Sequence, residues 1–320
     1  MNSTELISLI ALLEDDDREI VNHVESALLE LGSEVIPVLE NQWEFSKDAI
    51  HQQRIENVIH RIQFRKLKEE FKVWLHSEDQ DLLHGVYLIA KYRFPSLDKQ
   101  TLSNEIDKIR MDIWLEMQYD FTPFEKTRII NYVMYQVNGF KGNTENYHDP
   151  SNSFINQVLE SKKGNPIMLA VVYILVTQRL NLPIFGVNLP QHFVLAYKEV
   201  DSTPDINTRF NQVQKVLNTK EGTVLFYINA FNGGAIFSKL NLEQFLKQIS
   251  IEPKIEFFEP CSNLDIVKRV LRNLTAAYNK MDKKSKQKEI QELLFLLGEP
   301  DISHFDNITG IDDYQNEEED

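Results

Sequence analysis

The sequence predicts an α+β protein. It would have a helical N-terminal region, a core in which a buried helix packs on a small antiparallel sheet, and a C-terminal helical hairpin. Three observations predict this class. Apolar residues recur at helical spacing through most of residues 1–138, residues 167–176 are apolar on every side, and short β-branched and aromatic segments follow that run. A helix followed by a few antiparallel strands is a common α+β arrangement.

These patterns divide the chain into four expected parts: a helical region at 1–138, the core at 139–250, a helical hairpin at 251–298 and an acidic tail at 299–320. The tail ends in "IDDYQNEEED". Its composition predicts a disordered, solubilising end, and an acidic docking tail is the alternative.

The first helical region, residues 9–44, predicts a short helix, an Asp-rich turn and a longer helix. Asp15 to Asp17 offer N-caps for the longer helix, and Gly32 suits its C-terminal cap. Pro37 lies near the start of the next helix, where its fixed φ is tolerated. This pattern resembles one HEAT-type unit, which must stack on the helices that follow because one unit cannot bury its own face.

Three more segments show helical spacing: residues 51–75, 81–117 and 122–140. Thr122 is a suitable N-cap for the last of them, Pro123 occupies its first position, and Gly139 is expected to end it. His51, His60 and His76 do not share one helical face, so we expect structural roles for them and no metal site.

Composition narrows the function classes. Hydrophobic residues make up 42% of the chain and charged residues 26%, which is ordinary for a globular protein. The net charge of −15 repels phosphate backbones and argues against nucleic-acid binding. The longest nearly uncharged run, residues 164–178, is too short to span a bilayer, so we expect no membrane association. The single cysteine, Cys261, fits a cytoplasmic protein.

The core contains a buried helix that has Asn165 as N-cap and Pro166 at its first position. Three short segments after it predict strands, at residues 183–190, 192–200 and 223–231, and residues 232–237 read as a turn followed by a short fourth strand. Residues 201–222 form a long excursion between strands, and residues 238–249 return to helix. The hairpin at 263–298 resembles one tetratricopeptide-like pair of helices.

Two stretches of the core carry a family resemblance. They are "YHDPSNSFINQVLESKKGNPIMLAVVYILVTQRLNLPIFGVNLPQHFVLAY" and the later "FYINAFNGG". The sequence resembles the transglutaminase-like (papain-like) core of bacterial proteins of the Sir-B-one type, most closely over residues 140–235. The resemblance implies a helical region before this core and tetratricopeptide-like helices after it.

The resemblance also assigns three positions. Active members use Cys at the start of the buried helix, His on the following strands and Asp one strand later. Here the Cys position falls on Asn165, Pro166 and Ile167, the His position on His192 and the Asp position on Asn229. None of the first three carries a thiol or hydroxyl. The resemblance implies that this loss is usual in the Sir-B-one branch, which predicts a pseudoenzyme with vestigial positions Pro166, His192 and Asn229.

Displaced nucleophiles remain open alternatives, because a triad is defined by geometry and not by chain order. Cys261, Ser153 and Ser161 are the candidates, and Asn229 can still orient His192 through its amide oxygen. Each would need His192 within hydrogen-bond reach. The ordinary alternative for Cys261 is a small buried side chain.

The retained polar residues predict a binding pocket in the former cleft: Asn152, Ser153, Asn156, Glu160, Asn165 and Asn232. We expect Asn152 and Asn156 on one face of a helix that runs to Glu160. The alternative is that these asparagines only cap helices and turns.

We therefore expect a non-catalytic transglutaminase-like protein that acts as a cytoplasmic binding or regulatory module with a protein or peptide partner. The alternative is a hydrolase or acyl transferase acting on peptide or amide bonds through His192. We expect no cofactor, because the sequence has no phosphate loop, GxGxxG, HExxH or CxxC motif.

Overall fold

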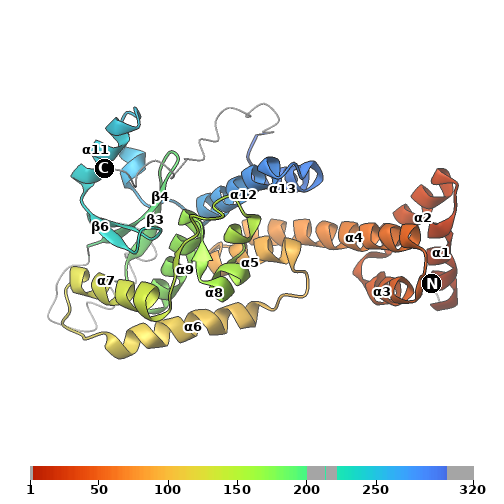
Figure 1. Ribbon diagram of the computed structural model, residues 1–320, viewed down its shortest axis with the longest axis horizontal. Helices are drawn as coiled ribbons and strands as arrows, with labels where there is room; N and C mark the ends of the chain where they lie inside the picture. The colour runs from red at the N-terminus through yellow and green to blue at the C-terminus, as the bar shows by residue number, and fades with distance from the viewer. Residues whose placement is uncertain (1–2, 200–212, 214–221, 301–320) are drawn as a thin grey trace. The chain divides into compact units, whose positions relative to one another are not determined.

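The computed structural model describes residues 3–199, 213 and 222–300 (Figure 1). Most of the predicted excursion at 201–222 and of the acidic tail at 299–320 lies outside the described residues. The chain divides into two compact units, Met1–Val73 with Lys91–Pro95, and Trp74–Ala90 with Ser96–Asp320. The four-part division expected from the sequence stays a prediction.

The first unit is helical. Its helices are α1 (Ser3–Ala11), α2 (Arg18–Leu31), α3 (Ile36–Phe45) and α4 (Ala49–Leu75), which begins in this unit. The predicted caps of α2 are confirmed, since Asp17 accepts a hydrogen bond from the Glu19 amide and Gly32 has φ +72°. All four helices contribute buried apolar residues to one core, for example Ile10, Leu28 and Ile55. The HEAT-type identity of this unit stays a prediction.

Among the described residues, the second unit contains these helices: α5 (Leu82–Arg93, which ends in the first unit), α6 (Lys99–Glu116), α7 (Pro123–Asn131), α8 (Ile155–Ser161), α9 (Pro166–Arg179), α11 (Lys239–Gln248), α12 (Asn263–Lys280) and α13 (Lys284–Leu296). Thr122 caps α7 in a reciprocal capping box with Glu125. Helix α7 continues as a π-helical turn, Tyr132–Val137, which the sequence pattern does not reveal. No helix in the described part of the chain is long and apolar enough to cross a membrane.

In the part of the chain that the structure describes, four antiparallel strands form the main sheet in chain order: β3 (Ile184–Asn188), β4 (Phe193–Lys198), β5 (Val224–Asn229) and β6 (Ala235–Phe237). Gly186 pairs with Leu195, and Ala196 pairs with Tyr227. A short parallel pair, β1 (Lys141–Gly142) with β2 (Lys163–Gly164), lies apart from this sheet and was not expected. The predicted small antiparallel sheet is confirmed.

Helix α9 is the centre of the second unit. Every residue from 166 to 177 is buried, as its uniformly apolar sequence predicts. The helix contacts α6, α8 and α12 and packs on β3 and β4. The opposite face of the sheet is covered by a second apolar cluster that includes Val194, Leu246 of α11 and Phe258.

One expected helix is wrong. Asn152 and Asn156 do not share a helix, because a 3₁₀ turn at Pro150–Ser153 ends before α8 begins at Ile155. Asp149 caps the turn through the Ser151 amide, and Phe154 between the two elements is extended and fully buried. The extended backbone at Phe154, whose ring is buried, therefore interrupts the helical path between the two asparagines.

Candidate functional site

The start of α9 is fixed by its own local chemistry. The Asn165 side-chain oxygen accepts a hydrogen bond of 2.9 Å from the Met168 amide, and Pro166 follows at the first helical position. This cap satisfies one of the amides that a helix leaves without an internal partner. The helix start is therefore where the sequence predicts it, with Asn165, Pro166 and Ile167 in the position that the resemblance assigns to a nucleophile.

Ser153 lies directly beside this cap. The Asn165 amide nitrogen donates to the Ser153 hydroxyl oxygen at 2.9 Å, and the two residues are 5% and 2% exposed. Activating a serine requires a base that accepts its proton. The neighbouring group here is an amide donor, so this contact holds Ser153 in place and does not activate it.

Asn152 organises the loop that precedes Ser153. Its amide nitrogen donates to the backbone oxygens of Asn146 and Tyr147, and its oxygen accepts from the Asn143 side chain at 2.8 Å. The Tyr147 ring also contacts the Phe231 ring edge to face. The buried Asn152 side chain therefore fixes the backbone position of Tyr147.

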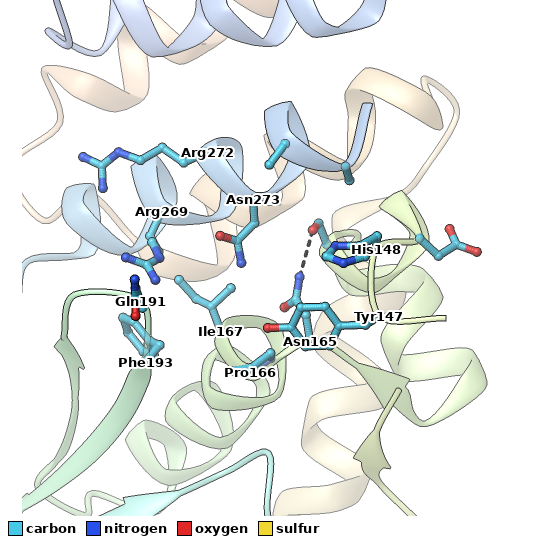
Figure 2. A pocket seen from close by; sticks show the side chains of 14 residues that line it. Tyr147, His148, Asn165, Pro166, Ile167, Gln191, Phe193, Arg269, Arg272 and Asn273 are labelled. Carbon is cyan, nitrogen blue, oxygen red and sulfur yellow. Dashed lines mark hydrogen bonds between the residues drawn. The ribbon is translucent and has the colours of Figure 1, made fainter. Parts of the chain in front are cut away.

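A pocket of about 120 Å³ opens at the start of α9. Its wall is built by four elements: the Tyr147–Ser153 loop, the first turn of α9, the start of β4 and helix α12. Figure 2 shows Arg269 extending from α12 toward Gln191, and Asn273 extending from α12 toward Ile167 of α9. All of these elements belong to the second unit.

The pocket wall carries two guanidinium groups and one carboxylate. Arg269 donates to the backbone oxygen of Leu189 at 3.3 Å. Arg272 pairs with the carboxylate of Glu299 through Nε, at 3.1 Å, and through Nη2. The Asp149 carboxylate accepts from the Ser151 amide. The Glu299 carboxylate offsets the charge of Arg272, so the two guanidinium groups stand against the two carboxylates Asp149 and Glu299.

His192 does not line this pocket, although its neighbours Gln191 and Phe193 do. The imidazole packs edge to face against Phe245 of α11, with ring centroids 4.4 Å apart. Burial, together with the charge of Arg269, lowers the pKa of His192 to about 4. His192 is therefore neutral at pH 7 and is too weak a base to hold a proton there.

Asn229, which takes the Asp position of the resemblance, shapes a turn. Its side-chain oxygen accepts hydrogen bonds from the Phe231 and Asn232 amides. The side chains of Asn156, Glu160, Asn229 and Asn232 do not line the pocket, and Glu160 and Asn232 are exposed. Of the six predicted binding residues, Ser153 and Asn165 reach the pocket wall.

The displaced nucleophiles lie elsewhere in the second unit. Cys261 follows the 3₁₀ turn at Ile255–Phe258, and its amide donates to Gly186 of β3. The Ser161 hydroxyl donates to the Gln157 carbonyl at the end of α8. Neither residue lines the pocket. The described residues contain no group of three His, Cys, Asp or Glu side chains arranged to hold a metal ion.

Sequence reasoning missed the α12 wall of the pocket. Arg269, Arg272, Asn273 and Ala276 follow one another at spacings of three, one and three, which places them on one helical face. That face is polar or small, whereas the buried face of α12 is apolar. The polar face indicates that α12 contributes to a polar surface, but the sequence does not identify the element that this face packs against.

A buried helix on a small antiparallel sheet, with a pocket at the helix start, is the arrangement expected of a transglutaminase-like core. Residues 100–272 match the family described as the transglutaminase-like superfamily, and the chain belongs to that superfamily.

Several relatives share parts of this sequence. The chain is 27% identical to a UPF0162 protein of Xylella fastidiosa (strain Temecula1) over 217 residues, which covers 65% of this chain and 68% of the relative. For the UPF0162 protein of strain 9a5c the identity is 26%, over 63% of this chain and 66% of the relative. The match thus spans about two thirds of these relatives. F-box only protein 21 of Mus musculus is 40% identical over 68 residues, 21% of this chain and 11% of that protein. No solved structure matches the chain.

Proposed function

We propose that this chain is a non-catalytic transglutaminase-like protein of the Sir-B-one type that acts as a cytoplasmic binding or regulatory module. Its binding site would be the pocket at the start of α9. The observation that carries the proposal is the identity of the residues at the nucleophile position. Asn165, Pro166 and Ile167 stand there, beside a cavity lined by both polar and apolar side chains, with no thiol among the described lining residues.

The catalytic alternative needs a nucleophile and a base within about 3 Å of each other. Ser153 lies in the pocket wall, but its hydroxyl oxygen accepts from the amide of Asn165. His192 packs on Phe245 instead of lining the pocket. These contacts support the binding role over a hydrolase or acyl transferase that works through His192.

The size of the pocket indicates what kind of partner fits. Sites for drug-sized ligands usually measure about 300–1,000 Å³. A pocket of about 120 Å³ is smaller and suits one side chain or one chain end of a larger partner. A peptide segment of a protein partner meets this requirement, and the rest of the segment would lie on the surface around the pocket.

A synthetic peptide library tests the proposal. N-terminally biotinylated random decapeptides, half ending in a carboxylate and half in an amide, are incubated with the full chain, and bound peptides are identified by mass spectrometry. The library is compared between wild type and Asn273→Trp, which fills the pocket from α12. The matched control is Asn279→Trp, an exposed position on the same helix that does not line the pocket.

We expect a set of peptides that wild type and Asn279→Trp retain and Asn273→Trp does not. We also expect His192→Gln to retain that set, because His192 does not line the pocket. Peptides shortened during incubation with wild type and left intact with His192→Gln would instead establish the hydrolase alternative. If no peptide depends on position 273, the pocket is not a peptide site and the proposal is wrong.

A further inference from the structure

The charge of the pocket differs in sign from that of the chain. The chain has 49 acidic and 34 basic residues, with a net charge of −15. The described pocket wall contains Arg269, Arg272 and the acidic residue Asp149, and the carboxylate of Glu299 offsets the charge of Arg272. Lys280 adds a positive charge beside this wall, since its ammonium group contacts the imidazole of the lining residue His148. A locally positive pocket on an acidic protein attracts an anionic group and disfavours a cationic one.

The two arginines are held in defined positions. The bond from Arg269 to the Leu189 backbone orients its guanidinium at the pocket wall. Arg272 gives Nε and Nη2 to Glu299, a residue that is 9% exposed. A guanidinium group has five N–H donors, so this pairing leaves its Nη1 donors for another acceptor. Groups fixed in this way lose little conformational entropy when they bind a ligand.

The neutral polar groups in the wall can donate hydrogen bonds as well as accept them. Asn273 and Gln191 each present an amide, and Tyr147 presents a phenol. The first turn of α9 adds the positive end of a helix dipole. The Asp149 carboxylate already accepts from the Ser151 amide, at the cap of the 3₁₀ turn. An ionised carboxylate is a pure acceptor and pairs with arginine in a planar geometry, so it complements this set of donors.

We propose that the pocket binds a carboxylate of a peptide, with Arg269 and Asn273 as its principal contacts and Arg272 at the rim. This inference rests on the proposed binding function and names the group that the pocket takes. The carboxylate is either the C-terminus of the partner peptide or an Asp or Glu side chain within it. The volume of about 120 Å³ admits a carboxylate with the first atoms attached to it.

Matched synthetic peptides test the chemistry. A retained peptide is made with a free carboxylate and with an amide at its C-terminus, and any acidic side chain is replaced by its amide in a second pair. Affinities for the full chain are measured by fluorescence anisotropy at two salt concentrations. We expect one of the two replacements to weaken binding at least tenfold, and that replacement identifies the source of the carboxylate. The preference should shrink at high salt.

Two variants assign the preference to the pocket. Arg269→Gln removes one positive charge and should abolish the preference for the acid form. Asn273→Asp adds a negative charge at the wall and should weaken the acid form at least tenfold more than the amide form. Arg128→Gln is the matched control, because it removes an exposed arginine on α7 outside the pocket and should leave the preference unchanged. Circular dichroism confirms that each variant is folded, and Asn273→Asp keeps the test decisive if Arg269→Gln does not fold.

The possible failures are distinct. Pocket-dependent peptides that bind equally well as acids and as amides would overturn the carboxylate inference and leave the binding function standing. A preference for the acid form that persists in both Arg269→Gln and Asn273→Asp would place the carboxylate outside the pocket and would also overturn it. Absence of any pocket-dependent peptide in the library would instead remove the proposed function itself.

Discussion

Consecutive residues at the start of β4, from His192 just before it to Val194, lie on opposite faces of the main sheet and have different surroundings. On the α9 face, Phe193 fills the space beside Gly186 and forms part of the pocket wall. On the α11 face, His192 packs against Phe245, and Val194 joins the apolar cluster. Successive side chains of a strand point to opposite faces, so adjacent positions enter different surroundings.

This difference explains how a transglutaminase-like core can retain a histidine without retaining a base. The pocket face holds the polar contacts of Asn165, Ser153 and Arg269. On the α11 side His192 packs against the Phe245 ring, and burial together with the charge of Arg269 lowers its pKa to about 4. The presence of a residue type at a family position therefore does not establish its role, because the role depends on the face to which the strand directs it.

The largest expected effect is on packing at the α9 face. Phe193→Ala should lower the free energy of unfolding by about 3–5 kcal/mol, because the buried ring contacts Gly186 and leaves a cavity when truncated. Phe245→Ala on the other face should cost less, since Phe245 is only partly buried. Urea denaturation of both variants measures the difference. Equal losses would show that the two faces are packed equally tightly.

The next effect concerns the pH dependence of stability. The pKa of His192 is about 4 in the folded chain and about 6.5 in an unfolded one. Between these values the unfolded state binds more protons, so stability is fully present above pH 6.5 and is lost as the pH falls toward 4. At pH 4.5 the loss attributable to His192 should reach about 2–3 kcal/mol relative to pH 7.

The comparison with His192→Gln isolates this contribution from the carboxyl groups that titrate in the same range. Unfolding free energies of both proteins are measured between pH 7.5 and pH 4.5, where the variant should lose less stability than wild type. Parallel curves would mean that His192 is solvated in the folded chain and that the α11 face does not exclude charge.

The local signals in the sequence predicted most of the fold correctly. Thr122 with Glu125, Asn165 with Pro166, and the short β-branched and aromatic segments at 183–190 and 192–200 all act through residues close in the chain. The break between Asn152 and Asn156 was missed, because burial of the Phe154 ring depends on tertiary packing. The π-helical turn after α7 was missed as well, since its apolar spacing resembles that of an α-helix.

The candidate site was less predictable. Asn165 and Ser153 could be proposed because the resemblance points to the start of α9, and both line the pocket. Arg269 and Asn273 lie about a hundred residues further along the chain, and only the packing of α12 on α9 brings them there. No spacing rule connects positions so far apart in sequence.

A smaller effect tests the polar contacts at the start of α9. Asn165→Ala removes both the helix cap to Met168 and the bond to Ser153, and it should lower the free energy of unfolding by about 1–2 kcal/mol. Asn165→Asp keeps an acceptor for the cap and loses the donor to Ser153, so it should cost less than the alanine variant. Chemical denaturation at pH 7 measures both. An unchanged stability in Asn165→Ala would mean that water replaces these contacts without loss.

The smallest expected effect is at Asn232, which the sequence placed among the binding residues. Its side chain is exposed, and its contribution to the β5–β6 turn is a backbone amide that donates to Asn229. Asn232→Ala keeps that amide, so stability should change by less than about 0.5 kcal/mol, whereas Asn229→Ala removes the shared acceptor and should cost about 1 kcal/mol. Peptide affinity should be unchanged in Asn232→Ala. A tenfold loss of affinity in that variant would extend the binding surface beyond the pocket to the β5–β6 turn, because the fold itself makes no use of this side chain.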